Sequence, residues 1–246
     1  LSREAAKNIL VNISNNEYNH AQIAAFMTVY LMRAISVEEL EGFRDALLEL
    51  CLKVDLGDVE SIDIVGTGGD GKNTFNISTL SCFLVAGAGY KVTKHGNYGV
   101  SSACGSSNVL EHLGYTFTND ADQLQQQLDR SNLCFLHAPY FHPAMKAVAP
   151  IRRELGVKTF FNMLGPLVNP IQPKHQLLGV FNLELSRLYQ YILQQSNRNY
   201  TIVYALDGYD EVSLTGAFKL RTQRGEQLLT PEILGKKALR QEDLHG

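Results

Sequence analysis

The sequence has no excess of positive charge and no long apolar run. Its formal net charge is −3, so it lacks the basic surface with which proteins hold nucleic acid non-specifically. No stretch is long and apolar enough to span a bilayer, and no series of charged, apolar and small residues marks a signal peptide. We therefore expect neither a nucleic acid nor a membrane among the partners of this chain.

Cysteine is scarce and scattered along the chain. The four cysteines lie far apart and form no Cys-X-X-Cys pair: Cys51, Cys82, Cys104 and Cys134. This spacing speaks against a zinc site or a redox pair. Thiols of this kind are typical of a reduced cytoplasmic enzyme.

The N-terminal quarter of the chain has the hydrophobic pattern of helices. With 45% hydrophobic residues, 246 residues suffice for one large domain, alone or with a smaller helical one. Ser36 and Glu39 form a capping-box pattern, which opens one predicted helix. Two earlier segments carry apolar residues on one helical face, namely Ala5, Ile9 and Ile13, then Ile23, Phe26 and Tyr30. These patterns predict a helical domain over residues 1–57.

From residue 58 onward, short apolar runs alternate with longer amphipathic segments. The predicted strands cover 61–65, 91–94, 133–136, 176–181 and 200–206, and the predicted helices cover 78–88, 108–113, 121–131 and 183–196. This alternation predicts an α/β domain over 58–246, with a mostly parallel central sheet flanked by helices. Ligands of such sheets bind at the carboxyl ends of the strands.

A glycine-rich loop, Gly-Thr-Gly-Gly-Asp-Gly at 66–71, directly follows the first predicted strand. Glycines let the backbone approach a phosphate and turn several N–H groups towards it, and the helix that follows adds a positive dipole end. The loop is not a P-loop, since no Gly-Lys-Ser/Thr follows, and its third glycine is misplaced for a dinucleotide site. The alternative is a plain strand-to-helix turn capped by Ser78.

A second loop of small polar residues follows the next predicted strand. It begins with Lys-His-Gly-Asn at 94–97 and is rich in glycine and serine up to residue 107. A lysine ammonium, an amide and several hydroxyls suit a multiply charged, polyhydroxylated ligand. Two such loops after successive strands favour a phosphoribosyl-binding site. The alternative is a flexible surface loop with a structural His95.

Seven motifs together resemble the signature loops of the anthranilate phosphoribosyltransferase family. They are GTGGD at 66–70, NIST at 76–79, KHGN at 94–97, Ser101-Ser102, RRELGVKT at 152–159, FNMLGPLVNP at 161–170 and DGYDE at 207–211. They follow the family's order over nearly the whole chain. The resemblance implies a small helical domain with a contribution from about 143–158, a large α/β domain, and a homodimer formed through the helical domain.

The resemblance also implies an activity and roles for individual residues. Family members transfer the phosphoribosyl group of phosphoribosyl pyrophosphate (PRPP) to the amine of anthranilate, with Mg²⁺ as cofactor, in tryptophan biosynthesis. The residues that match the PRPP pocket are Gly66, Gly69, Asp70, Thr74, Asn76, Ile77, Ser78, Thr79, Lys94, His95, Gly96, Asn97, Ser101, Ser102 and Ser106. Those that match the anthranilate site are Gly66, Asn97, His142, Arg152 and Gly165, and those that match the Mg²⁺ ligands are Ser78, Asp210 and Glu211.

The implied chemistry depends on charge stabilisation and positioning. Mg²⁺ and backbone N–H groups neutralise the leaving pyrophosphate, and Arg152 forms a two-pronged hydrogen bond with the carboxylate of anthranilate. An arylamine is a nucleophile as it stands. We therefore assign no residue as general acid or base.

The chain departs from the family pattern in two respects. Tyr98 and Ala103 stand where many members carry basic residues, which removes positive charge near the phosphates. Members also usually continue beyond the segment that matches 229–246. The α/β domain is therefore expected to be incomplete at its C-terminus and to expose apolar surface there.

Two other functions remain open from the residues. Pyrimidine nucleoside phosphorylases share the architecture but place Ser-Thr after the Lys-His pair, where this chain has Gly96-Asn97. A non-catalytic, nucleic-acid-binding relative should lack the acidic pair, whereas Asp210 and Glu211 are present. Taken alone, such an acidic pair is more often a solvated turn than a metal site.

Overall fold

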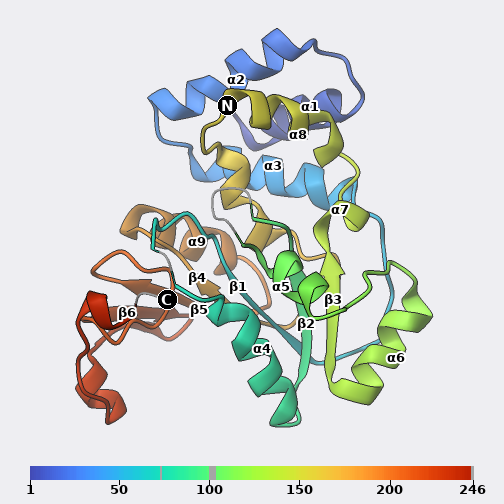
Figure 1. Ribbon diagram of the computed structural model, residues 1–246. Helices are drawn as coiled ribbons and strands as arrows, with labels where there is room; N and C mark the ends of the chain where they lie inside the picture. Colours follow the sequence, from blue (N-terminus) through green and yellow to red (C-terminus); the bar gives the residue numbers. More distant parts are fainter. Residues whose placement is uncertain (73, 100–103, 245–246) are drawn as a thin grey trace.

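The computed structural model describes residues 1–72, 74–99 and 104–244. A smaller helical part lies above a larger part that is built on one sheet (Figure 1). None of the helices formed by the described residues combines the length and the apolar character that crossing a membrane requires.

The central sheet of the described residues has seven strands in the order β3-β2-β1-β4-β5-β6-β7. The first five pair in parallel, and the last two add an antiparallel hairpin. The strands are β1 (Ser61–Gly66), β2 (Lys91–Gly96), β3 (Leu133–His137), β4 (His175–Gly179), β5 (Asn199–Ala205), β6 (Phe218–Thr222) and β7 (Gly225–Leu229). The predicted fold class, a helical part plus a mostly parallel α/β sheet, is confirmed.

The β6–β7 hairpin is the part of the sheet that the sequence did not predict. Glu226 of β7 pairs with both Lys219 and Arg221 of β6, at 2.6 and 2.5 Å. Four of the five β7 residues are exposed, so the strand lacks a regular alternation of apolar and polar residues. Cross-strand ion pairs and backbone pairing define this hairpin, and neither leaves a clear hydrophobic pattern.

Helices cover the sheet and connect its parallel strands. α4 (Ile77–Gly87) packs on β1 and β2, α6 (Ala121–Ser131) packs on β3, and α9 (Leu183–Leu193) packs on β5 and β6. The remaining short elements are α5 (Ser106–His112), α7 (Ala138–Phe141), η1 (Phe160–Met163), η2 (Gly165–Leu167), η3 (Pro231–Leu234) and η4 (Gln241–Leu244). This arrangement places the carboxyl ends of the parallel strands, with the loops that follow them, below the helical part (Figure 1).

The helical part consists of α1 (Arg3–Ser14), α2 (His20–Met32) and α3 (Val37–Glu49), joined by α8 (Met145–Leu155) from the middle of the chain. The capping box of Ser36 and Glu39, predicted from the sequence, is present. Asn19 and Gln22 form a second one at the start of α2. Each box satisfies N–H groups that a helix start leaves unpaired.

The buried face of α1 includes the predicted Ile13 but is otherwise displaced by one position from the predicted face. Ala6, Leu10 and Ile13 are the buried residues, whereas Ala5 and Ile9 are half-buried. Successive helical residues point about 100° apart, so all five belong to one broad apolar stripe. The position of α3 decides which residues lie at its centre.

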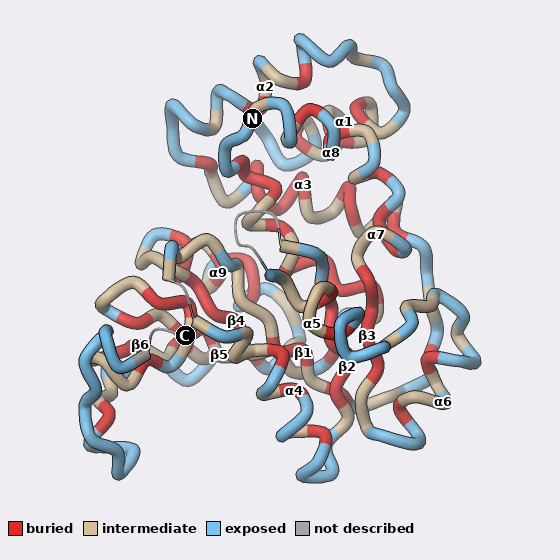
Figure 2. Tube along the Cα trace, in the orientation of Figure 1, coloured by how far each residue is buried: buried red, intermediate tan, exposed pale blue. Residues whose placement is uncertain are grey.

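One hydrophobic core extends from the helical part into the sheet. Phe43 of α3 and Phe160 of η1 stack with ring centroids 4.4 Å apart. The same cluster of buried residues contains Val148 of α8, Leu178 of β4 and Ile202 of β5. Figure 2 shows buried positions along the central strands and through α3. The two parts therefore share apolar contacts across their boundary.

Gly42 permits the close crossing of α1 and α3. A Cβ atom at this position would lie 2.2 Å from the carbonyl oxygen of Arg3 and 2.8 Å from the Cβ of Ala6. Gly87, at the end of α4, is the contrasting case, because a Cβ there would meet no atom within 4 Å. The two glycines therefore differ in packing although both lie in helices.

We expect Gly42→Ala to lower the free energy of unfolding by about 2 kcal/mol, because overpacking costs about 1–3 kcal/mol and exceeds the helix-propensity gain of about 1 kcal/mol. Gly87→Ala should instead raise it by about 0.5–1 kcal/mol. Urea unfolding of both variants, at equal protein concentration, measures the two signs. Equal stabilisation by both substitutions would contradict the tight crossing.

Candidate functional site

The loops at the carboxyl ends of the parallel strands bring the acidic pair against the first glycine loop. Asp210, in the loop between β5 and β6, accepts a hydrogen bond from the backbone N–H of Gly68 at 2.8 Å through Oδ2. A Cβ at Gly66 would lie 2.5 Å from that Oδ2, and a Cβ at Gly179 would lie 1.7 Å from the Asp210 carbonyl oxygen. Glycine at the ends of β1 and β4 is therefore what lets the acidic loop approach.

Burial and mutual repulsion perturb the carboxyl groups at this edge. Burial raises the pKa of Glu211 to about 8, and the nearby charges of Asp210 and Asp70 add to the shift. Burial likewise raises the pKa of Asp210 to about 6, again with a contribution from Asp70. Lys94 and the backbone N–H of Ser78 act in the opposite direction on Glu211. Such a crowded set of acids is stabilised by a cation.

The donor set at this edge fits a Mg²⁺ ion shared with phosphates. Mg²⁺ prefers hard oxygen ligands, and proteins often bind it through one or two carboxylates plus phosphate oxygens and water. In the described part of the chain, no three His, Cys, Asp or Glu side chains are grouped so that they could hold a metal ion by themselves. Asp210 and Glu211 therefore fit a site that a phosphate ligand completes.

The start of α4 presents polar groups beside the glycine loop. Its N-cap is Asn76, whose Oδ1 accepts the N–H of Thr79 at 3.1 Å, so the expectation of a cap at Ser78 is wrong. The Ser78 hydroxyl donates weakly to the same Oδ1, at 3.4 Å. The hydroxyls of Thr67 and Thr79 are buried and have no hydrogen-bond partner among the described residues. Buried orphan hydroxyls next to a helix N-terminus suit a phosphate-bearing ligand.

Lys94 lies beneath this loop with its charge inside the protein. Its side chain is buried, and Nζ donates to the carbonyl oxygen of Ile64 at 2.6 Å. The ammonium opposes the rise in pKa of Asp63 and of Glu211. Its positive charge therefore stabilises the carboxylates of Asp63 and Glu211.

His95 and His142, from different predicted substrate sites, lie side by side. Their ring centroids are 5.2 Å apart, and His95 Nδ1 shares a hydrogen bond with the carbonyl oxygen of Gly165 at 3.1 Å. His142 Nε2 contacts the carbonyl oxygen of Val168 at 2.9 Å. Burial lowers the pKa of His95 to about 3 and that of His142 to about 4. Both rings are therefore neutral near pH 7, and each retains one buried nitrogen that has no hydrogen-bond partner in the part of the chain that the structure describes.

The second loop folds back on itself through Asn97. Its carbonyl oxygen accepts the N–H of Ser107 at 3.1 Å and the hydroxyl of Ser106 at 3.4 Å. Gly105 is required for this fold, because a Cβ there would lie 2.5 Å from the same oxygen. Tyr98 donates to Glu111 at 3.3 Å. Ser101, Ser102 and Ala103 lie outside the described residues.

The predicted anthranilate residue Arg152 lies at the C-terminal end of α8. Its Nη2 donates to Asn162 Oδ1 at 3.1 Å, and its guanidinium lies 5.4 Å from the ring centre of Phe161. Burial lowers its pKa, and its Nε has no partner among the described residues. The contacts of those residues do not join Arg152 to Gly66 or Asn97. The structure therefore joins Gly165 to His95, whose ring lies beside that of His142, and leaves Arg152 on a neighbouring segment.

Lys158, Asp63 and Gly179 belong to the site although the sequence did not single them out. Lys158 Nζ donates to the carbonyl oxygen of Gly69 at 2.6 Å, which joins the segment after α8 to the glycine loop. Asp63 is fully buried in β1. A charged residue between Ile62 and Ile64 was the available signal for Asp63. Gly179 gave none, because only the folded chain shows what it approaches.

Two protein-family models match the chain, and both describe domains of glycosyl transferases. The helical bundle domain of the glycosyl transferase family matches residues 1–51, and the a/b domain of the glycosyl transferase family matches residues 58–246. The fold and the phosphate-compatible edge are thus those of a glycosyl transferase.

The most similar relatives narrow this class. The chain is 62% identical to the anthranilate phosphoribosyltransferase of Flavobacterium psychrophilum and 58% identical to that of Bacteroides fragilis, each over 100% of this chain and 74% of the relative. It is similar to the solved enzyme of Thermus thermophilus, with a TM-score of 0.85, 34% identity and coverage of 100% and 74%. It is also similar to that of Saccharomyces cerevisiae in complex with PRPP and Mg, with a TM-score of 0.91, 29% identity and coverage of 100% and 73%. The chain belongs to the anthranilate phosphoribosyltransferase family, as the sequence motifs predicted.

We expect the double substitution Asp210→Asn with Glu211→Gln to abolish turnover while leaving the metal-free fold at least as stable. Removing preorganised charge stabilisation costs on the order of 10²–10³-fold in rate. The pKa of Glu211 is raised from 4.5 to about 8, so the metal-free protein should lose stability as the pH rises from about 6.5 towards 8.

The double variant should not lose stability as the pH rises through this range, because asparagine and glutamine do not ionise. The two buried histidines do not interfere in that window, because their lowered pKa values affect stability only below about 6.5. Melting temperatures at several pH values, with and without Mg²⁺, measure both effects. Near-parental turnover of the variant would reassign the acidic pair to a structural role.

Proposed function

We propose that this chain transfers the phosphoribosyl group of PRPP to the amine of anthranilate. The products are N-(5-phosphoribosyl)anthranilate and pyrophosphate, in a step of tryptophan biosynthesis in the cytoplasm. The observation that carries this proposal is the meeting of the glycine loop and the acidic loop through the Gly68 N–H and Asp210. The nucleoside phosphorylase and nucleic-acid-binding alternatives are not favoured by relatives that all carry the same enzyme name.

The donor pocket is proposed to lie along the two loops after β1 and β2. The loop N–H groups, the start of α4 and the free hydroxyls of Thr67 and Thr79 are suited to phosphate oxygens. The proposed PRPP residues are those that match the family motifs: Gly66, Gly69, Asp70, Thr74, Asn76, Ile77, Ser78, Thr79, Lys94, His95, Gly96, Asn97, Ser101, Ser102 and Ser106. Closely spaced backbone donors hold a phosphate chain without a large side chain in the way.

Asp210, Glu211 and Ser78 are proposed to hold Mg²⁺ together with the pyrophosphate. Bound there, the ion would neutralise charge that builds up on the leaving group. The crowding of Asp210 and Glu211 with Asp70, which raises the pKa values of the pair, supports this assignment. The buried ammonium of Lys94 keeps Glu211 ionised more readily than burial alone would allow.

The acceptor is proposed to bind between Gly165, His142 and Arg152, with Asn97 and Gly66 on the donor side. Arg152 carries a guanidinium with an unpartnered Nε, which suits the anthranilate carboxylate. The rings of His95 and His142 are neutral near pH 7, so they add no positive charge beside the acceptor. The amine forms a bond to C1 of the ribose as the bond from C1 to pyrophosphate breaks, and the nitrogen then loses a proton to water or to the departing pyrophosphate. Positioning thus replaces a general base.

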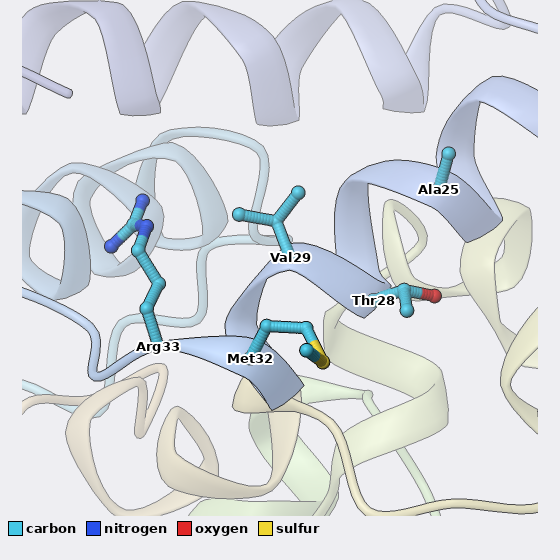
Figure 3. Close-up of a pocket in the computed structure, with 5 residues that line it drawn as sticks. All are labelled: Ala25, Thr28, Val29, Met32 and Arg33. Atoms are coloured by element: carbon cyan, nitrogen blue, oxygen red, sulfur yellow. The ribbon is translucent and has the colours of Figure 1, made fainter.

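The chain is proposed to fold as a helical domain over 1–57, with 143–158 added to it, and an α/β domain over 58–246. The packing of α8 on α1 and α2 supports this division. The helical domain is further proposed to form the homodimer. On α2, Ala25, Thr28, Val29, Met32 and Arg33 line a shallow apolar hollow (Figure 3).

The exposure of this hollow supports an interface there. Met32 is 84% exposed and Val29 is 45% exposed, although both are large apolar side chains. Exposed apolar patches of this kind commonly mark protein–protein contacts. A two-fold interface would place the same α2 face of two chains against each other.

Release of pyrophosphate with anthranilate as co-substrate tests the proposed activity, and phosphorolysis of thymidine should be absent.

Arg152→Ala should raise the KM for anthranilate far more than that for PRPP, because losing a partly buried charge pair costs on the order of 2–5 kcal/mol. Arg153→Ala is the matched control, since Arg153 is the exposed neighbour on the same helix. An unchanged KM for anthranilate would assign Arg152 to holding Asn162.

Sedimentation tests the proposed dimer. One chain has a mass of 27.3 kDa, and the unsubstituted protein should sediment with twice that mass. Substituting both Val29→Glu and Met32→Glu should give monomers, because like charges would face each other across the two-fold axis. Leu113→Glu, at another position that is 68% exposed, should remain dimeric. A dimer that survives the α2 substitutions would place the interface elsewhere.

A further inference from the structure

A carboxylate is buried in the middle of the central sheet. Asp63 lies on β1 between Ile62 and Ile64 and is 0% exposed. Burial raises its pKa to about 6, which the charge of Lys94 and two hydrogen bonds oppose. A buried carboxyl group is costly unless its hydrogen bonds are satisfied, so its partners indicate why the fold tolerates it.

The two oxygens of Asp63 bind two different segments of the site. Oδ1 accepts the backbone N–H of His95, at 3.2 Å, from the segment that leads into the second loop. Oδ2 accepts Nδ2 of Asn169, at 2.9 Å, from the segment that follows Gly165. The same Asn169 nitrogen also donates to the carbonyl oxygen of Thr93 at 2.8 Å. Asp63 is thus bonded to two segments. One is residues 94–99, which lead into the second loop and are called the donor loop below. The other is residues 165–171, which are called the acceptor segment.

These contacts close into a ring. From Asp63 the ring passes to His95, and from the His95 ring to the carbonyl oxygen of Gly165 at 3.1 Å. The backbone then leads from Gly165 to Asn169, which returns to Asp63. The N–H of Ile171 bonds to Asn169 Oδ1 at 3.0 Å, so the Asn169 side chain cannot turn without losing a bond. A closed ring fixes distances that separate bonds would leave free.

We propose that Asp63 is a positioning residue, which sets the separation of the donor loop and the acceptor segment and so aligns the two substrates. The role rests on the proposed assignment of His95 and Asn97 to PRPP and of Gly165 to anthranilate. Asp63 itself touches neither substrate. It acts through His95 and Asn169, and its removal affects the alignment of a ternary complex more than the binding of either substrate alone.

A purely structural role for Asp63 is the alternative, and Ser61 provides its measure. Ser61 lies two residues earlier on the same strand, is buried, and its hydroxyl shares a hydrogen bond with that of Thr93 on β2 at 3.0 Å. This bond also joins β1 to β2, but it lies away from both loops. Ser61→Ala therefore lowers stability without disturbing the ring.

The experiment compares Asp63→Asn with Ser61→Ala in this chain. Asparagine keeps the acceptor for the His95 N–H but turns an amide N–H₂ towards that of Asn169. Asp63→Asn should lower kcat by about 10- to 100-fold, since a displacement of about 1 Å between reacting groups has effects of that size. The KM of each substrate, and calorimetric binding of PRPP with Mg²⁺, should change by less than about threefold. Ser61→Ala should keep kcat within about twofold at a comparable loss of melting temperature.

Adding Asn169→Asp to Asp63→Asn restores a bond between the two positions with its direction reversed. It should recover part of kcat, because the bond from position 169 to the carbonyl oxygen of Thr93 is lost. Hydrogen exchange gives a readout that does not depend on turnover. Protection should fall together in segments 94–99 and 165–171 of Asp63→Asn, and should stay unchanged there in Ser61→Ala.

Equal kcat losses per degree of melting temperature in the two variants would overturn the positioning role, as would loss of protection in one of the two segments alone. An inactive parent chain would instead speak against the proposed function, and the exchange result would still decide the role of Asp63.

Discussion

The approach of the β5–β6 loop to the ends of β1 and β4 is the constraint on which the site depends. The Asp210 carbonyl oxygen lies where a Cβ of Gly179 would be, and its carboxylate lies against Gly66 and the Gly68 N–H. This closeness buries both acids of the loop, which raises their pKa values. A larger residue at either strand end would displace the acidic loop and separate the proposed metal ligands from the phosphate loop.

Much of the fold could be predicted because it depends on local patterns. Ser36 and Glu39 specify a helix start within four residues, and the apolar runs of β1 to β5 stand out because parallel strands are buried on both faces. The β6–β7 hairpin could not be found in this way. It is local too, but Glu226 pairs with Lys219 and Arg221, and charged side chains leave no apolar run to mark a strand.

The same distinction applies to the site. The glycine and serine loops are visible as sequence motifs, and the resemblance of the whole series of motifs to one family allowed Gly66, Asp70 and the acidic pair to be proposed. The roles of Asp63 and Lys158 depend on partners 106 and 89 residues away, and no local pattern contains that information. The N-cap of α4 shows the limit at short range, since Asn76 is the N-cap although Ser78 has an equally suitable side chain two residues later.

The shared core has a consequence for how such chains diverge. Phe43 stacks on Phe160, which stacks in turn on Phe161 at 4.4 Å, so side chains more than a hundred residues apart fill one space. A chimaera that took residues 1–51 from one relative would therefore need the segment around α8 and η1 from the same parent. Two distant stretches of chain form this packed core, so a change of side-chain volume in one of them requires a matching change in the other.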